Sequence, residues 1–356
     1  MAIQEQATWA SAMKAVRNLV LGLLLSALFL WLAQRGLDWS RVETVLRSLR
    51  WGYAPILPLV WIGSLTCRSL RWRGLLNQPS SFRSVFHVYN VGLMVNSTIP
   101  FRAGDLARVY LISHQGVGRI SGWAALGAIL IERLLDMLAV ALLFAIVLLF
   151  LPVASAVVVA GMVLGGAGAA ALMVLVIFSR RPRWALQLLG SVLQVLPLVR
   201  RLGAARQLQL LLDGLESLTT TRGFLRAVAW TGVAWLLSVL EVWILALLLP
   251  ELPMTTSAAA GLALAVVAVS FSIIVPFTVA NVGPFEAAVV FALGAVGVTQ
   301  EAALTFALMW HAGVALNSVL WGLIGLVALG ASPREIRQGL RAMRDGRGAG
   351  PQVIDH

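Results

Sequence analysis

Long apolar runs, separated by short polar segments, follow one another along the whole chain. Because a bilayer core requires about 20 consecutive apolar residues of helix, we interpret each continuous run as a membrane-spanning helix, tilted or shortened toward that length. The continuous runs cover residues 19–33, 53–67, 122–151, 153–178, 228–249 and 302–329. The pattern therefore predicts an all-α, polytopic helical membrane protein with about six full spans.

Two further apolar stretches, 84–118 and 258–298, are interrupted by helix-breaking residues. The breaks contain Pro100, Gly104, Pro276, Asn281, Gly283 and Pro284. Each stretch has an apolar-Pro-Phe step, a glycine, and then a carboxylate, Asp105 or Glu286, that opens a new apolar helix. Irregular backbone at membrane depth is tolerated only where it is buried in protein or faces water. We therefore predict two opposed re-entrant hairpins, related as an inverted repeat; a chance match of two short segments is the alternative.

Arginine placement predicts how the spans are oriented. Basic residues gather in segment 179–206 and in the tail after residue 330, whereas the joints at 151–155 and 250–257 contain none. Cytoplasmic loops are enriched in Lys and Arg, so both basic segments and both chain termini are predicted to be cytoplasmic. This topology requires the first hairpin to enter from the cytoplasm and the second from outside.

The remaining segments fit a single transmembrane domain over 1–330 and a basic cytoplasmic tail over 331–356. Segment 180–225 is too polar to span a bilayer and too apolar to lie free in water. We predict interfacial amphipathic helices there, with a small soluble domain as the alternative. The loop 34–52 should be external, yet it is rich in arginine. Its Ser40-Arg41-Val42-Glu43 sequence has capping-box spacing and predicts a short amphipathic helix.

Composition strengthens the membrane assignment. Of 356 residues, 60% are hydrophobic and 12% charged, and the mean hydropathy is +0.89, which excludes a soluble protein. The net charge of +12 rests on arginine, because Lys14 is the only lysine. Positive-inside anchoring together with a GC-rich genome is one explanation. Recognition of lipid phosphate by planar guanidinium groups is the other.

Several classes of function have no support in the sequence. No soluble basic domain is present to bind nucleic acid. Cys67 is the only cysteine, so there is no disulfide framework and no thiolate metal site. Phosphate-binding loops, nucleophile elbows and zinc-protease motifs are absent. We therefore expect no cofactor, no metal and no catalytic residues.

Charged residues within the apolar stretches are candidates for function, because buried charge is costly in a membrane. Arg102 in the first break and Arg108 in the following helix could together hold a phosphate, with Asp105 fixing one of them. Alternatively, Asp105 caps the helix and both arginines extend to the headgroups. Arg68 and Arg71, near the end of the second span, are either a cytoplasmic anchor or an entry site for an anionic headgroup.

A second group of charges lies near the start of the run 122–151. Glu132 and Asp136 are four residues apart and share one helix face, and Arg133 is placed to pair with Asp136. The group is either a structural ion-pair cluster that braces the first hairpin or a proton or substrate site. Glu286 follows Gly-Pro and is either an ordinary helix-start residue or a carrier of a coupling proton.

Isolated polar residues and small residues within the spans have simpler interpretations. We expect Glu241, His311 and Asn317 each to make one interhelical hydrogen bond. Gly161 and Gly165 form a GxxxG pattern, which predicts close helix packing or a dimer seam.

Four short motifs, in this order, are similar to those of a known family of membrane proteins. They are R-x-x-R-W at Arg68, Arg71 and Trp72; N-x-x-x-P-x-R-x-G-D-x-x-R from Asn96 to Arg108; E-R-x-x-D at Glu132, Arg133 and Asp136; and P-x-x-x-x-N-x-G-x-x-E from Pro276 through Asn281 and Gly283 to Glu286. Over nearly its full length the chain resembles the lysylphosphatidylglycerol synthase transmembrane region family, which is flippase-like.

The resemblance implies an integral protein of the inner cell membrane that moves a lipid between leaflets. The cytosolic aminoacyl-transfer domain of the full synthase has no counterpart after the last span, so the resemblance implies translocation rather than lipid aminoacylation.

We therefore hypothesise a translocator of a lipid with an anionic or modified phosphate headgroup. The predicted headgroup-binding residues are Arg102, Arg108, Arg68, Arg71 and Asn96; the predicted charge-balancing or proton-carrying residues are Asp105, Glu132, Arg133, Asp136 and Glu286. The alternatives are a membrane-embedded transferase for lipid-linked glycan or phospholipid, an accessory subunit of such a pathway, and a transporter of a small anion. The expected partners are a membrane lipid, a second copy of the chain and a separately encoded lipid-biosynthetic enzyme.

Overall fold

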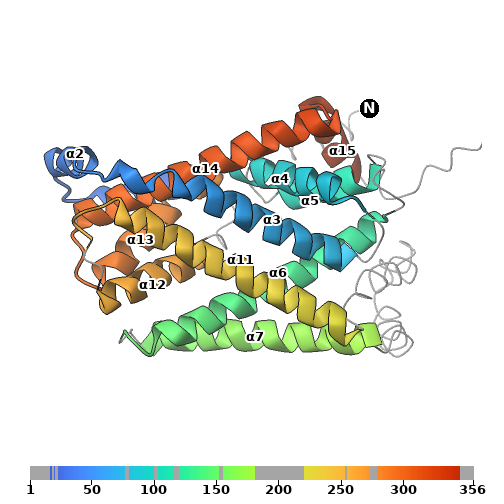
Figure 1. Cartoon of the computed structure of the whole chain (residues 1–356), viewed down its shortest axis with the longest axis horizontal. Helices are drawn as coiled ribbons and strands as arrows, with labels where there is room; N and C mark the ends of the chain where they lie inside the picture. The colour runs from blue at the N-terminus through green and yellow to red at the C-terminus, as the bar shows by residue number, and fades with distance from the viewer. Residues whose placement is uncertain are drawn as a thin grey trace, which may run out of the picture.

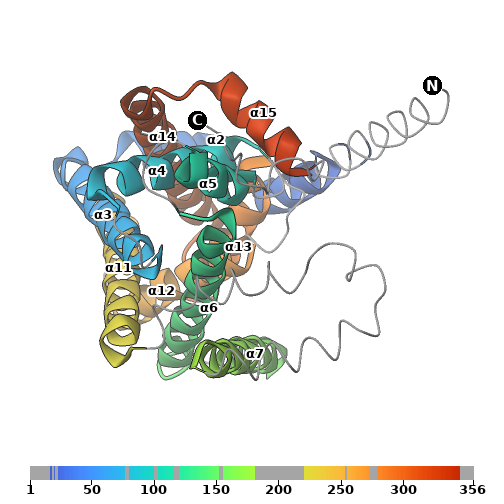
Figure 2. The same cartoon turned by 90° about the vertical axis from the view of Figure 1, so that its right-hand side faces the viewer.

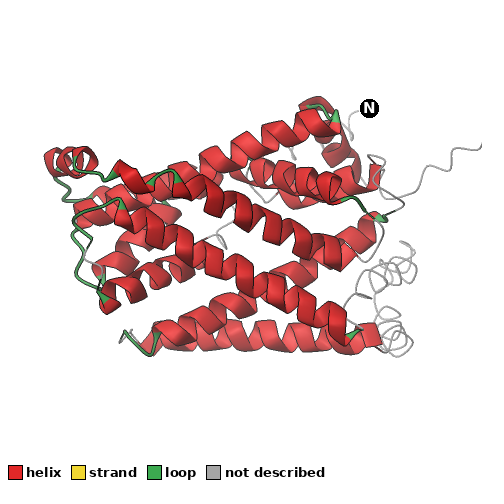
Figure 3. Ribbon diagram, viewed as in Figure 1, coloured by secondary structure: helices red, strands yellow, loops and turns green. Residues whose placement is uncertain are grey.

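The computed structural model of the chain describes residues 17, 20, 23–76, 80–99, 103–114, 120–151, 155–180, 220–252, 255–272 and 279–344. All regular elements in these ranges are helices, and the longest of them lie roughly along one common direction (Figures 1 and 3). The predicted all-α fold is confirmed for this part of the chain.

Five long helices form the body of the protein, together with the shorter apolar helix Leu23–Gln34. They are α3 (Ile56–Leu76), α6 (Gly122–Val147), α7 (Ser155–Arg180), α11 (Thr221–Leu247) and α14 (Gln300–Leu329). At about 1.5 Å per residue they extend roughly 30–45 Å, comparable with the thickness of a bilayer. By length and composition alone, α11 and α14 are able to cross a membrane, whereas α3 and α6 each contain three charged residues. The number of spans stays a prediction.

Helix α3 does not match the predicted span 53–67. It starts after the short helix η1 (Trp51–Tyr53) and continues to Leu76. Of the three arginines in its second half, Arg71 does not mark a membrane surface, because it and its neighbour Trp72 are buried inside the protein. A hydropathy pattern counts every arginine as exposed, so the span predicted from it ends before the observed helix does. Ion pairs inside the protein are what make the burial of these residues possible.

The two interrupted stretches form two pairs of helices. The first pair is α4 (Phe82–Thr98) and α5 (Ala103–His114); the second is α12 (Thr256–Ser272) and α13 (Pro284–Gly294), with η3 (Val279–Asn281) between them. Figure 1 shows the first pair toward one end of the long axis and the second pair toward the opposite end. Within each pair the helices pack on each other, and η3 contacts α4, so the two stretches meet inside the protein. Their re-entrant placement in a membrane stays a prediction.

The predicted breaks are placed only in part. Three predicted residues lie outside the described part of the chain: Pro100, Arg102 and Pro276. Gly104 was predicted to lie in the break, but the structure places it in the first turn of α5. A Cβ atom at Gly104 would collide with the Gly92 carbonyl oxygen of α4, so glycine allows the two backbones to touch. Gly283 precedes α13 as its N-cap residue, and Pro284 is its first residue.

Each pair of broken helices contributes to its own hydrophobic core. The core around α12 and α13 includes Leu262, Val289 and Phe306. The core around α4 and α5 includes Trp72 and Leu111. Helix α14 packs along α4 and α3 packs along α11, so these long helices join the two cores into one bundle.

Helix α7 lies at the edge of the bundle, with α6 between it and the pair α4 and α5 (Figure 2). The GxxxG glycines face α6: a Cβ atom at Gly161 would meet the Phe144 ring, and one at Gly165 would meet the Ala141 methyl group. The predicted close packing is therefore found between two helices of the same chain.

Two short amphipathic helices lie at opposite ends of the bundle (Figure 1). Helix α2 (Trp39–Arg47) forms in the loop 34–52, but its N-cap is Asp38 rather than the predicted Ser40. It buries Val42 and Val45 and packs on α14. Helix α15 (Pro333–Arg344) forms from the first part of the predicted tail and packs on α5.

The predicted interfacial segment 180–225 is almost wholly outside the described residues, which resume at residue 220. Its last five residues belong to α11, which begins at Thr221 and not at the predicted residue 228. The Thr220 hydroxyl accepts a hydrogen bond from the Gly223 N–H at 3.1 Å and so caps the helix. Capping chemistry, which a hydropathy pattern does not measure, places the start of this helix earlier.

Candidate functional site

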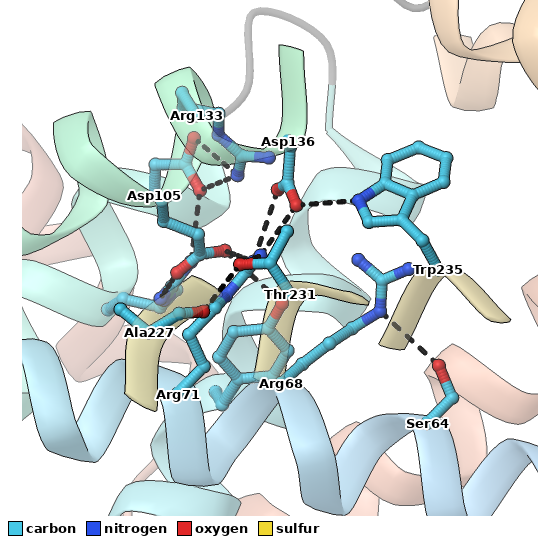
Figure 4. A network of polar contacts seen from close by, with 12 residues as sticks. Ser64, Arg68, Arg71, Asp105, Arg133, Asp136, Ala227, Thr231 and Trp235 are labelled. Carbon is cyan, nitrogen blue, oxygen red and sulfur yellow. Dashed lines mark hydrogen bonds and ion pairs between the residues drawn. The ribbon is translucent and has the colours of Figure 1, made fainter. Parts of the chain in front are cut away.

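Seven charged side chains converge inside the bundle, and Figure 4 shows five of them labelled. We call this group the charge cluster: Arg68 and Arg71 of α3, Asp105 and Arg108 of α5, and Glu132, Arg133 and Asp136 of α6. Glu132 and Asp136 lie near the middle of α6, a 26-residue helix. These two carboxylates are therefore far from both ends of α6, and charges near the middle of a membrane helix are the most costly to bury.

Arg71 and Asp136 form the first ion pair of the cluster. Two nitrogens of Arg71 donate to the two Asp136 oxygens at 2.6 and 3.1 Å, a bidentate arrangement. The Thr231 hydroxyl of α11 accepts from Arg71 at 3.1 Å, and the Trp235 indole N–H donates to Asp136 at 3.0 Å (Figure 4). This pair ties α3, α6 and α11 together.

Arg108 and Glu132 form the second pair, and both are only 1% exposed. Arg108 Nη2 donates to Glu132 Oε2 at 2.7 Å, and Nη1 donates to Oε1 at 3.3 Å. The Tyr89 hydroxyl also donates to Glu132 at 3.3 Å. The guanidinium carbon of Arg108 lies 4.1 Å from the centre of a Trp72 ring and 4.4 Å from the centre of the Tyr89 ring. Aromatic faces thus stabilise a buried cation that is also paired.

Arg133 and Asp105 form the third pair, since Arg133 Nη2 donates to both Asp105 oxygens at 2.9 and 3.2 Å. The sequence interpretation had paired Arg133 with Asp136 on the same helix. Within the described residues, Asp136 instead pairs with Arg71 of α3, and Arg133 with Asp105 of α5. Pairs between helices replace the pair within one helix because the three helices pack together here.

Arg68 differs from the other three arginines of the cluster. Its Nε donates to the Ser64 hydroxyl at 3.3 Å, and its Nη2 donates to the Ser238 hydroxyl of α11 at 3.0 Å. Its guanidinium carbon lies 5.8 Å from the centre of the Trp235 ring. Among the described residues no carboxylate lies within ion-pair distance of Arg68. Its hydrogen bonds go to hydroxyl groups, and the carboxylates of Asp136 and Glu241 act on its charge only from beyond ion-pair distance.

The charge cluster is therefore asymmetric. Four guanidinium groups face three carboxylates, and the positive charge left over is that of the partly buried Arg68. Because the extra positive charge is only partly exposed and has no carboxylate in hydrogen-bond contact, the site is electrostatically suited to an anion.

A second polar site lies at the turn between α12 and α13. Glu286 Oε2 accepts a hydrogen bond from the Gly283 N–H at 2.7 Å. Its other oxygen lies 2.6 Å from Nδ1 of His311 on α14, and His311 Nε2 lies 2.9 Å from the Ala280 carbonyl oxygen. Asn281 donates to the Ser272 hydroxyl at 2.8 Å. Glu286 thus has both the predicted helix-start position and a partner on another helix.

The predicted site residues fall into four sets. The structure brings seven together in the charge cluster, and it places Glu286 in the second site. Asn96 accepts from the Gly104 N–H at 2.8 Å and so joins α4 to α5, outside the cluster. The predicted headgroup residue Arg102 lies outside the described residues.

Sequence reasoning missed several partners of these groups. Thr231 and Trp235 lie four residues apart on α11 and so share a face, but nothing in their spacing indicated a carboxylate opposite. Nothing in the sequence of the apolar helix α4 indicated that Tyr89 contacts a buried charged residue. His311 was expected to make one hydrogen bond, but both of its ring nitrogens have close polar neighbours.

Long apolar helices that enclose paired charges are consistent with a helical membrane protein. The chain belongs to the lysylphosphatidylglycerol synthase transmembrane region family, since the family model described as "Lysylphosphatidylglycerol synthase TM region" matches residues 19–332. The match is to the transmembrane region alone and indicates no other domain. Comparisons with curated proteins and with solved structures gave no match. Family membership ties the protein to lipid metabolism or translocation.

Proposed function

We propose that the protein translocates a lipid with an anionic phosphate-containing headgroup across the inner cell membrane, and that Arg68 binds the phosphate. Family membership supports a role with lipids. The single observation that supports an anionic headgroup is the charge left over at Arg68 in the interior of the bundle.

The paired arginines are less suited to bind the headgroup. Arg71 and Arg108 already make short hydrogen bonds to carboxylates, so a phosphate would have to displace Asp136 or Glu132. Displacement would leave a carboxylate buried without its partner, which is strongly unfavourable. We therefore reassign both arginines from headgroup binding to holding α3 and α5 against α6. Of the headgroup-binding residues predicted from the sequence, we therefore keep Arg68 in the proposal. Arg102 remains a candidate.

Arg68 has the geometry for reversible binding. Its present partners, the Ser64 and Ser238 hydroxyls, are neutral, and exchanging them for phosphate oxygens gains a charge-assisted interaction. The Ser64 hydroxyl is then free to donate to the same phosphate, whereas the Ser238 hydroxyl already donates to the Ala234 carbonyl at 3.1 Å. A headgroup would thus be held by one cation and one hydroxyl group, both from α3.

The test is leaflet exchange of fluorescent lipids in proteoliposomes, read from the fraction accessible to an impermeant quencher. The lipids are phosphatidylglycerol, phosphatidylcholine and lysylphosphatidylglycerol. We expect the wild-type protein to move a phosphate lipid faster than protein-free liposomes do. Arg68→Gln should slow this movement about tenfold or more, because a hydrogen bond to a charged group contributes about 1.5–3 kcal/mol.

Two matched variants sharpen the result. Arg222→Gln removes an exposed arginine in the first turn of α11 and should leave movement unchanged. Arg68→Lys keeps the charge but loses the planar fork, so it should restore movement only in part. Equal movement by wild type and Arg68→Gln, with both proteins folded, would exclude Arg68 as the headgroup site. If none of the three lipids moves faster than in protein-free liposomes, the proposal that the protein translocates phosphate-containing lipids is wrong.

A further inference from the structure

The pair Glu286 and His311 is not explained by headgroup binding. Glu286 is 2% exposed, and the pair connects the turn between α12 and α13 to the middle of the long helix α14. Phe285 stacks on the His311 ring at 4.4 Å between ring centres and covers one of its faces. The imidazole is therefore held in a fixed position between Glu286 and the Ala280 carbonyl.

The two contacts of the His311 ring need one more hydrogen than a neutral imidazole supplies. Both neighbours of the ring, a carboxylate oxygen at 2.6 Å and a carbonyl oxygen at 2.9 Å, are hydrogen-bond acceptors when Glu286 is ionised. A neutral imidazole has only one N–H, so it leaves one of the two contacts without a hydrogen. One additional proton resolves this, either on Nδ1 as an imidazolium or on Glu286 as a carboxylic acid that donates to Nδ1. In both arrangements Nε2–H donates to Ala280, and one proton is shared between the two side chains.

The turn that this proton holds is strained. Ala280 and Asn281 have φ values of 54° and 62°, and Gly283 has a φ of 96°. Left-handed backbone at non-glycine residues is sparsely populated and persists only where surrounding contacts enforce it. The contact from His311 to the Ala280 carbonyl is one of these, and it is made at the first left-handed residue. Loss of the proton would leave either this contact or the one to Glu286 without a hydrogen, and either loss weakens the support of the left-handed backbone.

We propose that Glu286 and His311 form a proton-binding site: one shared proton fixes the turn between α12 and α13 against α14, and release of that proton loosens it. If the protein translocates lipids as proposed above, this proton is the one whose uptake and release accompany lipid movement. The coupling rests on the proposed function, whereas the proton-dependent contact does not.

Other ionisable groups near the pair do not replace this proton. Within the described residues, no arginine or lysine pairs with Glu286. Neither α12 nor the helix Leu23–Gln34, whose Ser26 carbonyl lies against Gly283, contains an ionisable side chain. The nearest carboxylate on α11 is Glu241, which accepts from the Trp310 indole at 3.0 Å and not from His311. In the described part of the chain, no hydrogen bond or ion pair joins the ionisable side chains of α3 or α4 to the pair.

The test measures backbone protection and lipid movement in the same preparation. Hydrogen–deuterium exchange of the segment 279–286 is followed from about pH 5 to about pH 9. Rates are corrected for the intrinsic pH dependence of amide exchange. We expect protection of this segment to fall about tenfold or more as pH rises, while protection of α12 stays constant.

Three variants distinguish an effect of the shared proton on protection from a general effect on folding. In Glu286→Gln the amide oxygen still accepts from Gly283 and the amide NH₂ donates to Nδ1 of neutral His311, so protection should be high and independent of pH. His311→Ala should be poorly protected at every pH. Glu301→Gln, at the start of α14, should keep the wild-type pH profile.

The outcomes for the two proposals are distinguishable. A flat protection profile in the wild type, or a profile in Glu286→Gln that still depends on pH, would overturn the proton site whatever the lipid assay shows. A pH-dependent profile without lipid movement would leave the proton site supported and count against translocation. Lipid movement that does not change with pH, together with a pH-dependent profile, would refute the coupling alone.

Discussion

Replacing Glu132 by glutamine should destabilise the protein more than any other single change of a carboxylate to an amide. Glu132 is 1% exposed and lies 2.7 Å from Arg108 and 3.4 Å from Arg71. The amide has nearly the same shape, so the substitution removes charge without opening a cavity. It leaves four guanidinium groups facing two carboxylates.

The magnitude follows from burial. Breaking a buried ion pair by removing one partner costs about 3–5 kcal/mol, because the remaining charge stays buried without compensation. The exposed pair between Glu43 and Arg47, with side chains 62% and 78% exposed, is the matched control. Such surface pairs on a helix contribute about 0.3–0.5 kcal/mol, so Glu43→Gln should be nearly neutral.

The assay is equilibrium unfolding in mixed detergent micelles, with SDS as the denaturant and far-ultraviolet circular dichroism as the signal. A double variant, Glu132→Met with Arg108→Met, should be less destabilised than Glu132→Met alone, because it removes both buried charges of the pair. If Glu132→Gln and Glu43→Gln lower stability by the same amount, then Glu132 is not the partner of buried arginines and the charge cluster is wrongly described.

Three further predictions concern close contacts. Gly104→Ala should cost about 1–3 kcal/mol in the same assay, since its methyl group meets the carbonyl of the facing turn of α4, whereas Gly166→Ala on the open side of α7 should be tolerated. Gly283→Ala should destabilise because its φ is 96° and its methyl group meets a backbone carbonyl, while Gly232→Ala on α11 should be neutral or stabilising by up to about 1 kcal/mol. Ile336→Asp should release α15 from α5 and increase its cleavage by added protease, without changing the unfolding midpoint as much as Gly104→Ala does.

The sequence by itself determined the helical class, the approximate position of the long helices and the residue types of the charge cluster. Hydropathy suffices for this because a bilayer requires continuous apolar helices of a set length. It also indicated which charges mattered, since a charge such as Glu132 within an apolar run has to find a partner. The helix start at Pro284 followed from local chemistry, because proline is favoured at the first helical position.

Only the tertiary structure decided how those residues pair. Arg133 is three residues from Asp136, yet it pairs with Asp105, because packing of α5 and α6 brings side chains together that are 28 residues apart in sequence. The same packing buries Arg71, for which the sequence left open a cytoplasmic anchor or an entry site for an anionic headgroup. Arg68 differs from the other arginines of the charge cluster only because, among the described residues, no carboxylate lies within ion-pair distance of it. Charge balance in a membrane protein depends on contacts between helices, and these are fixed by the way helix faces pack, which no local pattern specifies.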